Sequence, residues 1–104
     1  MISWARVNEL KDEIGEEDFA EVAEMFLEEV EEVIAKLRSA PVEQELEQDL
    51  HFLKSSALNL GFDAMSKLCG DGETKAAQGA YSAISLPGLF ETYEASKHAF
   101  AQGA

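Results

Sequence analysis

Apolar residues recur every three or four positions along nearly the whole chain, and this spacing constrains the fold more than any other feature. Residues three and four apart share one side of an α-helix, whereas side chains of a β-strand alternate with a period of two. No run of alternating β-branched residues lies between turn dipeptides. The spacing therefore predicts an all-α fold. It is most regular at Phe19, Val22, Phe26, Val30, Val33 and Leu37.

The ends of the first two helices are marked by glycine and by charge. The apolar spacing over residues 4–14 predicts a short first helix, which Gly15 is expected to stop. Acidic residues 16–18 then lie where the positive end of a helix dipole favours them, at the start of the second helix. Lys36 and Arg38 complement the other end of that helix.

The third helix is expected to begin at Pro41 and to stop at Gly61. A proline fits the first turn of a helix, and a glycine fits the position just after its last turn. An apolar stripe between them predicts which side of this helix is buried. Its members are Leu46, Leu50, Leu53, Ala57 and Leu60.

The sequence gives opposing signals for the fourth helix. Asp63 is a candidate for its N-cap, while Gly70 and Gly72 weaken it by about 1 kcal/mol each relative to alanine. The pattern leaves residues 77–85 open between helix and loop. An amphipathic period returns over residues 86–100 and predicts a last helix there.

Amphipathic helices joined by short connections favour antiparallel neighbours. We therefore expect an antiparallel up-down four-helix bundle with a short additional N-terminal helix. A chain of 104 residues is large enough to form one core without support from a metal or a disulfide. Residues 1–104 are accordingly expected to form a single domain.

The chain is strongly acidic, with 21 Asp and Glu against 8 Lys and Arg and a net charge of -13. Nucleic acids and anionic membranes bind proteins through cations, so neither is an expected partner. A basic or apolar patch on another protein suits such a surface better. The acidic residues within 16–32 are most simply a solvated helix face, and the alternative is that part of this face recognises a basic patch on a partner.

Cysteine usage and hydropathy both point to the cytoplasm. Cys69 is the only cysteine, which rules out an intramolecular disulfide and fits a reducing compartment. Its apolar helical position favours a core residue over a reactive thiol. No apolar stretch is long enough for a secretory signal or for a membrane span. We therefore expect a cytoplasmic protein.

The third helix carries the residues that suggest chemistry. His51 lies opposite the apolar stripe, with Lys54 about 60° to one side and Ser55 about 40° to the other, at about 100° per residue. A neutral imidazole offers a nitrogen lone pair to an activated phosphoryl group. Lys54 can meet the negative charge that phosphorylation adds. Ser55 is small enough to leave room for a partner, and Leu58 adds apolar surface on the same face.

Spacing alone does not separate this chemistry from an ordinary solvated histidine, because a lysine three residues away is common on helices. His98 matches no pattern and is expected to be a surface residue. No metal site is expected, since the chain lacks a His-x-x-x-His motif and a cysteine pair. A di-iron bundle would need Glu-x-x-His, whereas Gln48 precedes His51 at that spacing.

The segment His51-x-Leu53-Lys54-x-Ser56-x-x-x-Leu60-Gly61 resembles the signature of the histidine-containing phosphotransfer (Hpt) domain, His-x-Leu-Lys-Gly-Ser-x-x-x-Leu-Gly. The segment Phe26-Leu27-Glu28-Glu29 is similar to the second-helix motif of that family. Cys69 and Glu73 stand where the family often has Cys-x-x-Leu-Glu. The resemblance extends over residues 19–73, which is most of the expected bundle.

The resemblance implies that His51 takes a phosphoryl group from an aspartate of one receiver domain and returns it to an aspartate of another, within a multistep phosphorelay. Lys54 and Ser55 would orient the phosphoryl group, and Phe52 and Leu58 would belong to the docking surface. The implied partners are response-regulator receiver domains and, beyond these, a hybrid histidine kinase. Because the metal ion of such systems belongs to the receiver, neither a cofactor, a metal nor an independent catalytic activity is expected here.

The sequence departs from the family pattern at two places. Ser55 stands where the family usually has Gly, so its hydroxyl either contacts the phosphoryl oxygens or crowds the partner. The segment Gly70-Asp71-Gly72 replaces more helix-forming residues. It puts the regularity of the fourth helix, and the placement of Glu73 near His51, in doubt.

Two other functions stay open at this point. The first is a helical adaptor that binds receiver domains or other signalling proteins without transferring a phosphoryl group. The second is a histidine-kinase fragment that phosphorylates its own histidine, although the chain contains no nucleotide-binding motif. Such a fragment would need a two-chain bundle, whereas an Hpt-like protein is expected to be a monomer.

Overall fold

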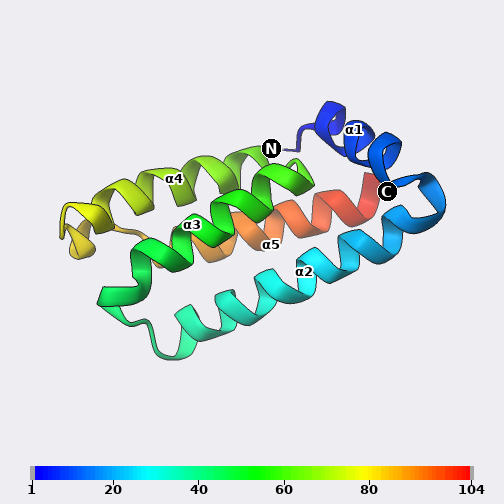
Figure 1. The fold of residues 1–104 in the computed structure, drawn as a ribbon. Coiled ribbons are helices and arrows are strands. Elements are labelled where there is room, and N and C mark those ends of the chain that lie inside the picture. The colour runs from blue at the N-terminus through cyan, green and yellow to red at the C-terminus, as the bar shows by residue number, and fades with distance from the viewer. Residues whose placement is uncertain (1, 104) are drawn as a thin grey trace.

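The computed structural model describes residues 2–103. Over this range the backbone forms five α-helices and one short 3-10 turn, with no strand beyond an isolated bridge between Ile2 and Phe62 (Figure 1). The expected all-α fold is confirmed. The elements are α1 (Trp4–Ile14), α2 (Glu16–Ser39), α3 (Glu43–Leu60), α4 (Asp63–Ala77), the 3-10 turn η1 (Tyr81–Ala83) and α5 (Leu86–Gly103).

The four long helices lie side by side in an elongated body of 42 × 22 × 21 Å. Consecutive long helices run in opposite directions (Figure 1). α3 packs against α2 and α4, while α5 packs against α4 and α2, so α3 and α5 occupy opposite corners of the bundle. α1 lies at one end, in contact with α2 and α3.

The core draws apolar side chains from all five α-helices. Every member of the stripe expected inside the third helix is buried, which confirms the predicted orientation of that helix. At the end near α1, the rings of Trp4, Phe19 and Phe62 surround Phe100, with centroids 6.4, 6.2 and 5.6 Å from that of Phe100. These aromatic contacts pack the end of α5 against α1, the start of α2 and the turn after α3.

Two glycines end helices as predicted. Gly15 has a φ of +96° between α1 and α2, and Gly61 has a φ of +78° after α3. L side chains rarely adopt this backbone conformation, which glycine tolerates. The N–H of Gly61 donates to the Leu58 carbonyl and that of Phe62 to the Ala57 carbonyl. These bonds close α3 and place Phe62 in the core, where it is buried.

Two predicted helix starts are wrong by one or two residues. Asp63 is the first residue of α4 rather than its N-cap, because Phe62 occupies the N-cap position and its carbonyl accepts the first helical hydrogen bond. α3 begins two residues after Pro41, because Val42 keeps an extended backbone (φ −112°, ψ 116°) as the N-cap. A β-branched residue favours that conformation.

The two glycines expected to weaken the fourth helix do not interrupt it. α4 is continuous through Gly70 and Gly72. Gly72 is buried against α3, and a Cβ at this position would lie 2.9 Å from Leu50 Cδ1. The absence of a side chain therefore lets α3 and α4 approach closely. In the segment left open between helix and loop, Ala77 ends α4 and the remainder holds turns and η1.

Polar contacts join α2 to α5 along the middle of the bundle. The hydroxyl of the buried Tyr93 donates to Glu31 Oε1 at 2.6 Å, and Lys97 Nζ donates to the same oxygen at 2.7 Å. Burial raises the pKa of Tyr93, while the hydrogen bond from Lys97 lowers the pKa of Glu31. Arg38 and Glu94 form a further ion pair between the two helices.

Candidate functional site

His51 stands near the middle of α3, on the side turned away from the core. Its side chain is 61% exposed, whereas Leu50 and Leu53 on either side of it are buried. Burial of these leucines fixes the rotation of α3 about its axis. The imidazole of His51 therefore reaches solvent from a rigid element rather than from a loop.

A carboxylate from α4 holds one nitrogen of this imidazole. Glu73 Oε2 lies 2.8 Å from His51 Nδ1, and Glu73 Oε1 lies 2.6 Å from Lys54 Nζ. An ionised carboxylate only accepts hydrogen bonds, so the proton in the first contact belongs to Nδ1. In the neutral ring, Nε2 then keeps its lone pair. We refer to His51, Lys54 and Glu73 as the His51 triad.

The triad keeps the Glu73 carboxylate ionised. Its hydrogen bond with Lys54, and less strongly that with His51, lowers the pKa of Glu73 against the opposing effect of burial. The side chains of Glu73 and Lys54 are only 21% and 32% exposed, so both are more sheltered than the imidazole.

Close packing between α3 and α4 brings the triad together. Cys69 is fully buried and orients α4, so that Glu73, one turn later, emerges at the edge next to α3. A Cβ at Gly70 would lie 3.5 Å from Lys54 Cδ, which is an ordinary van der Waals contact. The doubt about the placement of Glu73 is removed because α4 stays helical through both glycines and carries Glu73 to within 2.8 Å of His51.

The other predicted site residues surround the triad without joining it. Ser55 is exposed on α3, one turn after His51. Leu58 is 52% exposed one turn beyond the position of Lys54. Phe52 is half-buried and packs against the core, which leaves only part of its ring for a partner.

Two hollows lie along α3 on either side of the triad. Toward the start of α3, a shallow hollow next to His51 and Glu73 is lined by Gln44, Glu47 and Gln48. Toward its end, a second hollow is lined by the apolar Leu58 together with Asp63 and Lys67, which carry opposite charges. Within the triad, Lys54 is the cation that can attract an anionic phosphoryl group.

Two residues outside the triad have the roles that their sequence context predicts. Cys69 is a core residue, and burial raises the pKa of its thiol to about 12. His98 is exposed on α5 and is a surface residue.

Among residues 2–103, no three His, Cys, Asp or Glu side chains are grouped so that they could hold a metal ion. In the same part of the chain, no helix has both the length and the apolar character needed to cross a bilayer.

The geometry of the triad suits nucleophilic chemistry at one imidazole nitrogen. Nε2 faces solvent with its lone pair, while Glu73 is placed to stabilise positive charge that develops on the ring. Lys54 supplies a cation one helical turn away for an anionic reaction partner. These features together fit the capture of a phosphoryl group.

A comparison with models of protein families gives a match over residues 21–99, to the family described as the Hpt domain. The matched range includes all of α3 and α4, most of α2 and α5, and the whole His51 triad. Neither the comparison with curated proteins nor that with solved structures gave a match.

Proposed function

Because this chain belongs to the Hpt domain family, a family of phosphotransfer modules of two-component systems, we propose that it carries a phosphoryl group on His51 between receiver domains of a multistep phosphorelay. The observation that supports this role most directly is the exposed imidazole whose Nδ1 is held by Glu73 at 2.8 Å. Hpt domains carry a phosphoryl group rather than catalyse a reaction of their own.

In the proposed step, the Nε2 lone pair of His51 attacks the phosphorus of an aspartyl phosphate on the receiver. A nitrogen–phosphorus bond forms while the phosphorus–oxygen bond to the aspartate breaks, and the aspartate carboxylate leaves with the bonding electrons. The imidazole becomes a cation that keeps its Nδ1 proton, next to the Glu73 carboxylate. Since no proton has to be exchanged, transfer to a second receiver is the same step in reverse.

Lys54 and Ser55 are proposed to orient the transferred group. An ammonium has three N–H donors, and the contact of Lys54 with Glu73 Oε1 uses one of them. The remaining donors can reach phosphoryl oxygens on His51. Ser55 lies on the same face of α3 as His51, on the side of the imidazole opposite Lys54. Phe52 and Leu58 are proposed to contribute to the docking surface.

The proposed partners are response-regulator receiver domains and a hybrid histidine kinase that supplies the first phosphoryl group. We further propose that the carrier is monomeric and cytoplasmic. Size-exclusion chromatography with light scattering tests the monomer. A stable dimer would instead favour the dimerisation fragment of a histidine kinase.

Phosphoryl transfer from a panel of phosphorylated receiver domains tests the proposal. Wild-type protein, His51→Gln and the matched control His98→Gln are incubated with each labelled receiver. We expect acid-labile, base-stable label on the wild type and on His98→Gln, and none on His51→Gln. Binding of receivers without transfer to any of the three would instead indicate a non-transferring adaptor.

A further inference from the structure

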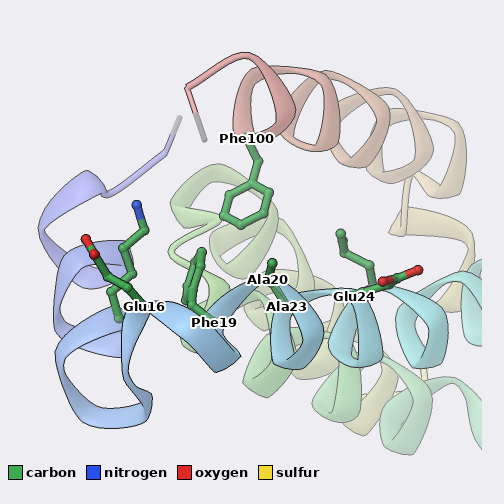
Figure 2. A pocket seen from close by; sticks show the side chains of 8 residues that line it. Glu16, Phe19, Ala20, Ala23, Glu24 and Phe100 are labelled. Atoms are coloured by element: carbon green, nitrogen blue, oxygen red, sulfur yellow. The ribbon is translucent and has the colours of Figure 1, made fainter.

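A hollow of about 480 Å³ opens between α2 and α5, toward the end of the bundle that α1 covers (Figure 2). Phe100 points from α5 toward Phe19, Ala20 and Ala23 on α2 (Figure 2). No residue of α3 or α4, the helices that carry the His51 triad, lines this hollow. Its lining consists of Lys11, Glu16, Phe19, Ala20, Ala23, Glu24, Leu27 and Phe100.

The hollow exists because the side chains that α2 directs toward α5 differ in size along the helix. In the middle of the bundle, Glu31 reaches across to Tyr93 and Lys97 and joins the two helices. Nearer the start of α2, the residues that face α5 are Ala20 and Ala23. Their methyl groups are too short to fill the space between the two helices. An apolar floor is left open to solvent between the helices.

A row of carboxylates runs along the exposed side of α2, and one of them, Glu24, also lines the hollow. Its members, which we call the acidic stripe, are exposed and spaced by three or four residues: Glu17, Glu21, Glu24 and Glu28. Within residues 2–103, none of the four has an ion-pair partner. Two cations near this part of the bundle pair with carboxylates outside the stripe, Lys97 with Glu31 and Lys36 with Asp49.

The carboxylates of the acidic stripe repel one another. Like charges three or four residues apart on a helix repel each other, and the stripe contains three such pairs. Cations supplied from outside would relieve this repulsion. Lys11 does not do so, because its ammonium lies over the Phe19 ring, 5.2 Å from the ring centroid.

We propose that the hollow and the acidic stripe together form a docking groove for a basic amphipathic helix of a partner protein. Apolar side chains of that helix enter the hollow beside Phe100, and its lysines and arginines lie along the stripe. The same charges disfavour two other occupants. A second copy of this chain carries the same net charge of -13, and an anionic membrane is repelled.

The groove is a function separate from phosphoryl transfer. Because its lining comes from α1, α2 and α5, a bound helix leaves the triad on α3 and α4 free. A partner held there can recruit the protein to a larger assembly while a receiver docks at His51. Binding at the groove is therefore expected to survive the loss of phosphoryl transfer.

The probe for a test is a synthetic peptide of about 18 residues, long enough for several helical turns. It carries leucine and phenylalanine on one face, flanked by lysine and arginine. A peptide of identical composition in scrambled order, which lacks an apolar face, controls for charge alone. Fluorescence anisotropy at physiological salt is expected to give one binding site, with an affinity about tenfold or more above that of the scrambled peptide.

Variants of the full chain locate the peptide. Ala20→Phe fills the hollow, and Ala95→Phe is the matched control at an exposed alanine of α5 that does not line it. We expect Ala20→Phe to weaken binding about tenfold and Ala95→Phe to leave it unchanged. Replacing Glu21 and Glu24 together by glutamine should weaken binding more than the same replacement at Glu43 and Glu91, which lie outside the groove.

Three results would overturn the proposal. Equal affinity for the amphipathic and the scrambled peptide would show that binding depends on net charge alone. Equal affinity of Ala20→Phe and Ala95→Phe, with both variants folded by circular dichroism, would place the peptide elsewhere. Concentration-dependent self-association that Ala20→Phe abolishes would make a second copy the occupant. His51→Gln is expected to bind the peptide like the wild type, so failure of phosphoryl transfer and failure of the groove are distinguishable.

Discussion

At the scale of single residues, the contact between Glu73 and His51 determines which atom of the imidazole is available. A carboxylate at Nδ1 fixes both the tautomer and the ring orientation, and it leaves Nε2 to the solvent. The same carboxylate binds Lys54, so one side chain of α4 positions both residues of α3 on which the proposed transfer depends.

Replacing Glu73 by glutamine should slow the acceptance of a phosphoryl group by His51. The amide keeps a hydrogen-bond acceptor but loses the charge that stabilises the cationic ring. The loss of one charge-assisted hydrogen bond corresponds to a rate about 10- to 100-fold lower. Rapid-quench measurement of transfer from a phosphorylated receiver provides the rate, and an unchanged rate would contradict a role for Glu73 in positioning or charge stabilisation.

The pH dependence of stability provides an independent test of the same contact. Because the pKa of Glu73 is lowered by folding, the native state binds this proton more weakly than the unfolded state does. The contact therefore stabilises the fold above the ordinary glutamate pKa, and this contribution is lost as the pH falls through the lowered value. In urea titrations, the difference in unfolding free energy between wild type and Glu73→Gln should shrink from pH 7 toward pH 3. A difference that stays constant would contradict the lowered pKa.

Ser55 marks the place where the chain departs from the usual family motif. The serine is exposed beside His51, where it either contacts the phosphoryl group or only borders it. We expect Ser55→Gly to keep the transfer rate within about tenfold of the wild type, because Lys54 supplies the principal charge on the phosphoryl group. Rapid-quench assays give the rate, and a larger loss would assign the hydroxyl a specific role.

At the scale of helices, periodicity predicted which elements form and which sides they bury. The stripe from Leu46 to Leu60 is buried throughout, and Gly15 and Gly61 end helices as expected. The periodicity of apolar residues carries no information about how closely two helices pack against each other. For that reason periodicity marks Gly70 and Gly72 as weak points of the fourth helix, whereas the structure keeps the helix continuous and uses Gly72 for its close contact with α3.

The candidate site was predictable only in part, for the same physical reason. His51 and Lys54 lie on one helix, so their relation follows from the helical repeat. The contacts of Glu73 depend on how closely α4 approaches α3, and the groove depends on a gap between α2 and α5. Both are properties of packing between helices that are distant in sequence.

The turn between α3 and α4 makes a sharp test of this packing. Gly61 has a φ of +78°, and a Cβ there would lie 2.7 Å from the backbone oxygen of Ser3. Gly79 has a φ of +74° as well. Among the described residues, however, a Cβ at Gly79 would have no heavy atom within 4 Å other than those of the adjacent residues. Gly79→Ala should therefore lower the unfolding free energy by about 1 kcal/mol through backbone strain alone. Gly61→Ala should cost about 1–3 kcal/mol more through overpacking. Equal losses in urea denaturation would contradict the close contact between α1 and this turn.

At the scale of the whole molecule, the bundle separates two surfaces of different chemistry. The α3–α4 side presents an imidazole with a lysine and a carboxylate, whereas the α2–α5 side presents an apolar hollow beside unpaired carboxylates. Such a separation allows one small protein to exchange a phosphoryl group on one side and to bind a partner on the other. The central claim concerns the first of these surfaces.

The most direct test of that claim is to locate the phosphoryl group after transfer from a receiver. Mass spectrometry under alkaline conditions identifies the modified residue, and NMR of the phosphorylated protein labelled with ¹⁵N at histidine identifies the bonded nitrogen. We predict a single phosphoryl group on Nε2 of His51, with the Nδ1 proton retained next to Glu73. A phosphoryl group on Nδ1 of His51, or on His98, would contradict the role assigned to the His51 triad.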